Sequence, residues 1–182
     1  MNRRTLLQGT ALTLVGGILA ACQSVTTPTV TPAEIITTAQ NIGPALLNAL
    51  TLTAPNALSA SQVTTINGYL SDATSLGSKL LPDITATQSA PTVKQIETDI
   101  NDVITFAAAI PLIPPPFSTA LAAASVALPL LEGFLNSVLP ATAAASPAAL
   151  AARQKAAALA PPMTLDQAKA TLAHYATRQT NN

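Results

Sequence analysis

Few residues in this sequence are able to do chemistry. The 182-residue chain holds one cysteine, Cys22, and one histidine, His174, so it lacks the set of thiolates and imidazoles that usually binds zinc. His174 stands near the end of the last expected helix beside Lys169 and Arg178, where an imidazole is usually solvated. No serine lies in a G-x-S-x-G motif. We therefore expect no enzyme, no cofactor and no metal site.

An acidic cluster is the remaining candidate for a site. Glu97, Asp99 and Asp102 lie close in the sequence, and Asp99 and Asp102 could share one face of a helix. Two such carboxylates could bind a hard cation or carry protons. Lys94 could pair with Glu97. The alternative, which we prefer, is that these charges form the solvated face of an amphipathic helix.

The beginning of the chain has the layout of an export signal. Arg3 and Arg4 precede an uncharged run from Thr5 to Leu19, and Leu19-Ala20-Ala21-Cys22 supplies the small residues of a cleavage site. This ending resembles the lipobox of bacterial lipoproteins. The resemblance implies that a diacylglycerol is attached to the Cys22 thiol, that the signal is removed before Cys22, and that the new amino terminus is acylated. Two or three acyl chains on one residue make attachment effectively permanent, because each buried CH₂ contributes roughly 0.8 kcal/mol.

Two other interpretations of this segment stay open. An ordinary signal peptide could be cut nearby and leave Cys22 as a free thiol. The segment could also be an uncleaved membrane anchor, although a spanning helix needs about 20 strongly apolar residues. The run is shorter than that and is interrupted by Gly9, Thr10, Thr13, Gly16 and Gly17.

The residues around the paired arginines also suggest an export route. Asn2-Arg3-Arg4-Thr5-Leu6-Leu7-Gln8 resembles the twin-arginine motif S/T-R-R-x-F-L-K. The match covers both arginines and Leu7, whereas Leu6 replaces Phe and Gln8 replaces Lys. The resemblance implies a protein that folds before it crosses the membrane. The general secretory route stays the alternative, because its signals also begin with positive charge.

The chain divides into three expected parts. Residues 1–21 are the cleaved signal, residues 22–33 are the lipidated cysteine with a polar, Thr- and Pro-rich tether, and residues 34–182 are a helical domain. Charged residues make up 9% of the chain and the formal net charge is zero, which excludes a basic surface for nucleic acid. From Cys22 to Glu132 the chain has two lysines and seven acidic residues. After Gly133 it has four basic residues and one acidic residue, Asp166. The two parts could therefore attract one another weakly.

Apolar residues recur at helical spacing throughout the domain, and no stretch alternates as a strand does. We expect an all-α fold, a small bundle of four main helices with one or two C-terminal helices. Capping signals at Thr31, Ser59 and Thr164, together with Ser146-Pro147, mark four helix starts. Two regular stripes, from Val93 to Ile110 and from Leu121 to Val138, indicate that the third and fourth helices pack together. The expected ranges are 32–50 with a kink or split at Gly43-Pro44, 59–81, 92–110, 121–138 with a bend at Pro129, 146–159 and 164–177.

The residues from Val103 to Leu131 form an uncharged segment with a proline-rich centre, Ile110-Pro111-Leu112-Ile113-Pro114-Pro115-Pro116-Phe117. One interpretation is a membrane-active hairpin of two short apolar helices. The alternative is that these helices form the buried centre of the bundle and the prolines make a stiff elbow between them. We prefer the alternative, because each arm is too short to span a bilayer.

Three functional classes follow from these features. The one we favour is a noncatalytic, lipid-anchored protein of the cell envelope with a structural or partner-binding role. The second is a membrane-perturbing protein, of a phage or toxin type, that uses residues 103–131. The third is an exported enzyme or ligand carrier with an apolar pocket. Gln23 follows Cys22 and differs from the Asp that resembles an inner-membrane retention signal in enteric bacteria, so we expect the outer membrane, facing the periplasm, in a cell with two membranes.

Overall fold

The structure, a computed structural model, describes residues 30–53, 57–81, 85–139 and 145–178. In these ranges the chain forms six α-helices and no strand, so the expectation of an all-α fold is confirmed. The described helices all belong to one compact unit that begins at Thr31.

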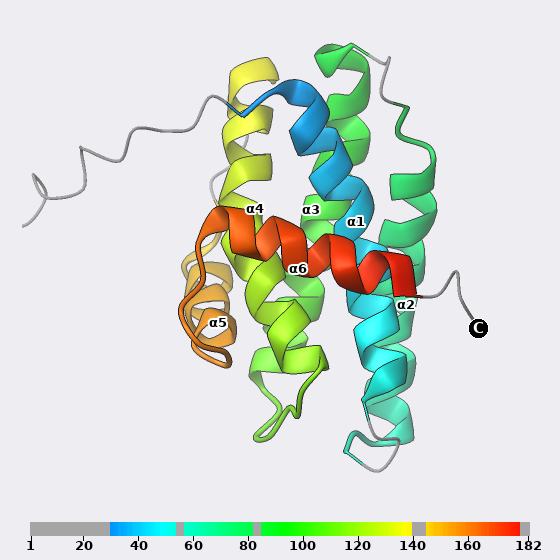
Figure 1. Ribbon diagram of the computed structural model, residues 1–182, viewed down its shortest axis with the longest axis vertical. Helices are drawn as coiled ribbons and strands as arrows, with labels where there is room; N and C mark the ends of the chain where they lie inside the picture. The colour runs from blue at the N-terminus through cyan, green and yellow to red at the C-terminus, as the bar shows by residue number, and fades with distance from the viewer. Residues whose placement is uncertain (1–29, 54–56, 82–84, 140–144, 179–182) are drawn as a thin grey trace, which may run out of the picture. The chain divides into compact units, whose positions relative to one another are not determined.

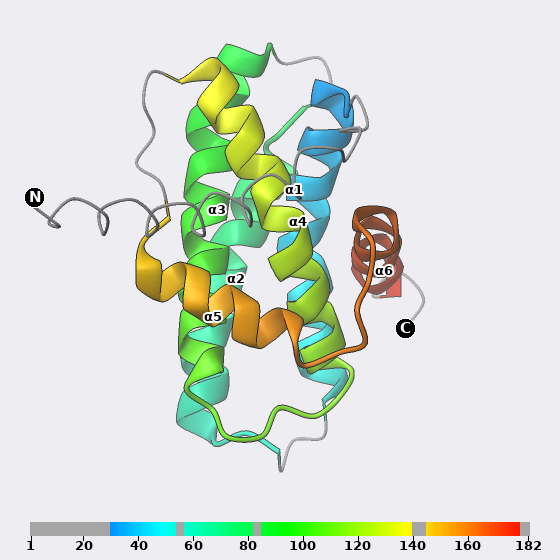
Figure 2. The same ribbon diagram turned by 90° about the vertical axis from the view of Figure 1, so that its left-hand side faces the viewer.

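Four long helices form an up-and-down bundle (Figure 1). They are α1 (Pro32–Leu52), α2 (Ala60–Ser78), α3 (Ala86–Ala108) and α4 (Phe117–Val138). Each helix contacts the next one in the chain, α4 returns to α1, and α1 also touches α3. Two shorter helices lie across the outside of the bundle. Figure 2 shows α5 (Pro147–Ala157) across α3 and α4, whereas α6 (Leu165–Thr177) crosses α1 and α4 in Figure 1.

Local capping sets where the helices begin. The Thr31 hydroxyl accepts a hydrogen bond from the Glu34 amide, and the Glu34 carboxylate accepts one from the Thr31 amide, which completes the expected capping box. Ser59 and Thr164 form the same reciprocal pair with a glutamine three residues later. Thr31 is thus the N-cap of α1 and Pro32 its first residue, at the end of the segment expected to be the tether.

Prolines inside the long helices do not split them. The expected split at Gly43-Pro44 is wrong, since α1 continues through Pro44, and α4 continues through Pro129 as one helix. The third helix begins at Ala86 rather than after Pro91, and the fourth begins at Phe117 rather than at Leu121. A proline inside a helix costs about 3 kcal/mol, which burial of the helix against its neighbours offsets. Gly43 illustrates that packing, because a Cβ there would come within 2.9 Å of the Thr74 amide nitrogen on α2.

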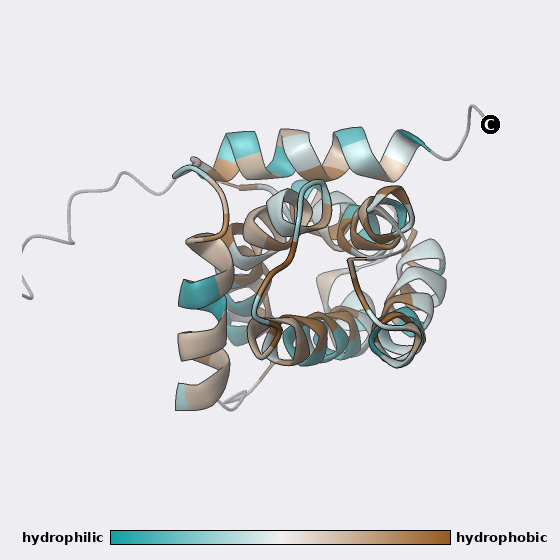
Figure 3. Ribbon diagram, turned by 90° about the horizontal axis from the view of Figure 1, so that it is seen from below, coloured by the Kyte–Doolittle hydropathy of each residue, from teal (hydrophilic) through white to brown (hydrophobic). Residues whose placement is uncertain are grey.

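The predicted apolar stripes form the core. Ile42, Leu46, Ile100 and Leu128, one or two from each of three long helices, are fully buried. The stripes of α3 and α4 are buried except at their far end, where Val138 is half-buried. The outer helices contribute less. Figure 3 shows the apolar segments of α6 on the side facing the bundle, where Ala168 and Leu172 are its buried residues.

The uncharged segment from Val103 to Leu131 lies within this bundle. Among the described residues one helix, α4, is long and apolar enough to cross a membrane, and 67% of its apolar window is buried inside the bundle. The connection before it buries Ile110 and Ile113 and exposes Leu112. This burial favours the interpretation of the segment as the bundle core.

Candidate functional site

The most concentrated set of charges is a buried network that joins α3, α4 and α5. A terminal nitrogen of Arg153, on α5, lies 3.2 Å from Glu97 Oε1 on α3 and 2.8 Å from Glu132 Oε1 on α4. Arg153 Nε donates to Asn101 Oδ1 at 2.7 Å. Asn101 Nδ2 in turn donates to Glu97 Oε1. Arg153 is 5% exposed and Glu97 4% exposed, so the central pair is withdrawn from water.

Helix geometry explains how this network forms. Lys94, Glu97 and Asn101 are spaced by three and four residues on α3, which places them in one row. Glu132 extends from α4 beside that row, and α5 crosses both helices so that Arg153 points into the gap between them. The planar guanidinium has donors enough to bind all three partners at once.

The three residues of the acidic cluster differ in their exposure to solvent. The predicted pair of Lys94 and Glu97 is present at 2.9 Å. The prediction that the cluster forms a solvated face is wrong for Glu97 and Asp99, which are buried, and right for Asp102, which is exposed. Charge patterning along one helix could not reveal this, because the burial comes from α5 and α2 packing over α3.

Asp99 lies in an unusual environment for a carboxylate. Its Oδ1 accepts a hydrogen bond of 2.8 Å from Gln95 Nε2, while its buried Oδ2 has no hydrogen-bond partner among the described residues. Burial raises the pKa of Asp99, the hydrogen bond from Gln95 opposes that rise, and the charges of Asp72 and Asp102 add to it. The side chain therefore holds a proton more tightly than an ordinary aspartate.

These arrangements do not assemble a metal site in the described part of the chain. No group of three or more His, Cys, Asp or Glu side chains there is placed to hold a metal ion. Glu97 pairs with Arg153 and Lys94, and Asp99 accepts a hydrogen bond from Gln95. The charged groups that Arg153 joins connect α5 to α3 and α4.

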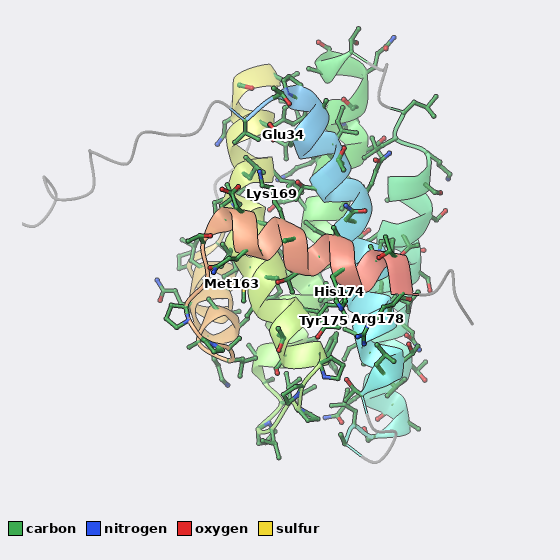
Figure 4. All side chains as sticks on the ribbon, in the orientation of Figure 1. Glu34, Met163, Lys169, His174, Tyr175 and Arg178 are labelled. Atoms are coloured by element: carbon green, nitrogen blue, oxygen red, sulfur yellow. The ribbon has the colours of Figure 1, made fainter. Side chains whose placement is uncertain are left out.

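The last helix carries the single histidine. His174 meets the ring of Tyr175 edge-on, with ring centroids 5.5 Å apart, and the Arg178 guanidinium carbon lies 6.0 Å from the Tyr175 centroid. Figure 4 shows these three residues together in the last turns of α6. Beneath them Asn48 of α1 donates hydrogen bonds to the carbonyls of Tyr175 and Ala176, where the helix leaves carbonyls unpaired.

The other end of α6 is tied to α1 by charge. Lys169 Nζ lies 3.8 Å from Glu34 Oε1 and 3.2 Å from Asp166 Oδ1 (Figure 4). Hydrogen bonds from the Thr31 backbone and side chain hold the pKa of Glu34 below its usual value, and Lys169 adds to that effect. The two outer helices therefore bring basic residues to acidic ones, in the direction that the uneven charge distribution predicts.

Seven residues expected to matter for export and anchoring lie outside the described residues. They are Arg3, Arg4, Leu7, Leu19, Ala20, Ala21 and Cys22. Their roles stay predictions from the sequence.

No protein-family model, no curated protein and no solved structure matches this chain. The signal motif and the packing of the described helices are therefore the basis for assigning a function.

Sequence reasoning did not single out Arg153, which is the centre of the buried network. Two features of the sequence point towards it in retrospect. Arg153 lies in an Ala-rich helix with little apolar bulk, and between Cys22 and Glu132 seven acidic residues stand against two lysines. The sequence does not reveal that α5 crosses α3 and α4. This crossing determines which acidic residues pair with Arg153.

Proposed function

We propose that this chain is a noncatalytic, lipid-anchored protein of the cell envelope, whose helical domain has a structural or partner-binding role at a membrane. The observation that carries the proposal is the sequence Leu19-Ala20-Ala21-Cys22 at the end of an export signal, with Cys22 the single cysteine. We place the anchor in the outer membrane of a two-membrane cell, facing the periplasm, because Gln23 follows Cys22.

The domain supports this assignment through what its polar residues do. The buried carboxylate of Glu97 is paired with Arg153 and Lys94, and the apolar stripes are buried where the helices pack together. A domain of this kind is suited to binding a partner or to holding a fixed position near a membrane.

Intact-mass measurement of protein extracted from membranes tests the anchor. We expect a chain that begins at Cys22 and carries the mass increment of a diacylglyceryl group and an amide-linked acyl chain. Cys22→Ser should move the protein out of the membrane fraction or leave the signal uncut. A mature chain of unmodified mass would contradict the proposal.

A second function has one observation in its favour. Because α4 is long and apolar enough to cross a membrane, a membrane-perturbing protein is the competing candidate. The two functions differ in a simple assay with the chain from residue 22 onward carrying Cys22→Ser. The anchored-domain proposal predicts a monodisperse, helical protein in plain buffer that releases no dye from vesicles. A protein that requires detergent, or that empties the vesicles, would favour the competing candidate.

A further inference from the structure

One end of the four-helix bundle is free of ionisable residues on its long helices. The sequence has no Asp, Glu, Lys, Arg or His between Glu34 and Asp72, or between Asp102 and Glu132. The first interval holds most of α1 and the first half of α2, and the second holds the end of α3 and most of α4. The up-and-down topology brings these parts together at the end opposite the start of α1, which is the lower end in Figure 1.

The connection between α3 and α4 exposes apolar groups at this end. Leu112 is 77% exposed and is flanked by exposed Pro111, while Ile110 and Ile113 on either side are buried and fix the loop to the bundle. At the same end Leu52, in the last turn of α1, is 47% exposed. We call the loop of residues 109–116 together with Leu52 the apolar tip.

The backbone of the apolar tip is unusually poor in hydrogen-bond donors. Four of the six residues from 111 to 116 are prolines, which have no backbone N–H. Irregular backbone normally stays out of the apolar part of a bilayer because each unpaired polar group costs several kcal/mol. A loop of this composition loses fewer hydrogen bonds to water than an ordinary loop when it meets lipid.

We propose that the apolar tip is a shallow membrane-contact site, and that its occupant is the bilayer to which Cys22 is anchored. This inference rests on the lipid anchor proposed above. No charged residue in the tip has to leave water, and the exposed leucines gain from burial among acyl chains. The nearest ammonium group, that of Lys155 on α5, donates to the Ala108 carbonyl at the edge of the tip, where lipid phosphates would surround it.

The lengths of the tether and of α1 make this contact possible. Cys22 precedes Thr31 by nine residues, and a chain of that length reaches at most about 30 Å. The 21 residues of α1 make a helix about 31 Å long. A fully extended tether therefore lets the start of α1 stand almost one helix length above the bilayer, and a tilt of the bundle brings the opposite end to the lipid.

A single tryptophan provides the test, because the chain has none. The mature chain is coupled through Cys22, its one thiol, to vesicles of phosphatidylethanolamine and phosphatidylglycerol that contain a trace of maleimide-headgroup lipid. For Leu112→Trp we expect a blue shift of the tryptophan emission on the vesicles and quenching by brominated acyl chains, with no release of trapped dye. The matched control is Leu81→Trp, since Leu81 is 58% exposed between α2 and α3 at the other end of the bundle.

Each outcome decides the inference. Equal emission of Leu112→Trp in solution and on vesicles would overturn it, because the apolar tip would then stay in water. A blue shift accompanied by dye release would also overturn it, because the bundle would then have opened into the membrane-active hairpin. Equal blue shifts for Leu112→Trp and Leu81→Trp would show non-specific adsorption and count against it. Because the coupling is chemical, these results are independent of whether cells attach lipid to Cys22.

Discussion

Arg153 pairs with two carboxylates on different helices, so removing its side chain should weaken the contacts of α5 with both α3 and α4. Arg153→Ala removes the buried counterion of Glu97 and leaves Lys94, whose side chain is 39% exposed, as the remaining one. Breaking a buried ion pair by removing one member costs about 3 to 5 kcal/mol. We expect a drop of that size in the free energy of unfolding, measured by urea denaturation followed by circular dichroism.

Neighbouring substitutions separate this effect from a general weakness of α5. Gln154→Ala changes the next, exposed residue and should alter stability by less than about 0.5 kcal/mol. Adding Glu97→Gln to Arg153→Ala removes the buried charge and should recover part of the loss. Equal stability of Arg153→Ala and Gln154→Ala would show that the network does not hold α5 in place.

Asp99 should make the domain less stable as the pH rises from acid to neutral. Its pKa in the folded chain is raised above the ordinary value of 3.8, mainly by burial. Below that value the carboxyl group is protonated in both folded and unfolded chains. Above it the unfolded chain ionises first, so the free energy of unfolding falls until the pH passes the folded-state pKa.

Asp99→Asn removes this titration and keeps an oxygen that accepts from Gln95. We expect the variant to be more stable than the natural protein at neutral pH, and the difference to vanish below pH 3.8, in denaturation series at both pH values. Asp102→Asn, one turn away and exposed, should show little of this dependence. A variant that is less stable at neutral pH would mean that the Asp99 carboxylate has a favourable partner.

At the level of single residues, then, the sequence predicts local pairs better than distant ones. The pair of Lys94 and Glu97 could be predicted because helical spacing alone brings the two side chains together. The contact of Glu97 with Arg153 depends on where a helix more than 50 residues later crosses α3, which no local spacing contains.

Among the helices, the packing of α3 against α4 should carry much of the stability. Ile100 and Leu128 are fully buried, and truncating such a side chain costs about 2 to 5 kcal/mol through lost burial and the cavity left behind. We expect Ile100→Ala and Leu128→Ala each to lower the unfolding free energy by that amount in chemical denaturation. The control is Thr105→Ala, at an exposed position of α3, which should be nearly neutral. Small effects at Ile100 and Leu128 would indicate a loosely packed centre.

The starts of the four helices with capping signals could be predicted, whereas the starts of α3 and α4 and the effect of Pro44 could not. Thr31, Ser59 and Thr164 act on amides within three residues, so the chain nearby contains all that is needed to recognise a cap. Whether Pro44 breaks α1 depends instead on how much burial the helix gains from α2 and α4, which is a property of the assembled bundle. Local breaking signals are therefore overruled where a helix is covered on several sides.

For the whole chain, the paired arginines predict the route of export. Replacing both Arg3 and Arg4 by Lys keeps the positive charge that the general secretory route requires and removes the twin-arginine motif. We expect the double variant to accumulate in the cytoplasm, as judged by fractionation. Unchanged export would assign the protein to the general route and would leave the proposed lipidation of Cys22 unaffected.

The contact between α1 and α6 joins the beginning and the end of the domain. Asn48 reaches carbonyls 127 and 128 residues further along the chain, and α6 covers a face of α1. During translation that face of α1 stays exposed to solvent until α6 has left the ribosome. Products cut short before residue 165 would thus display apolar surface that finished molecules hide, and cellular proteases could distinguish incomplete copies from complete ones by this difference alone.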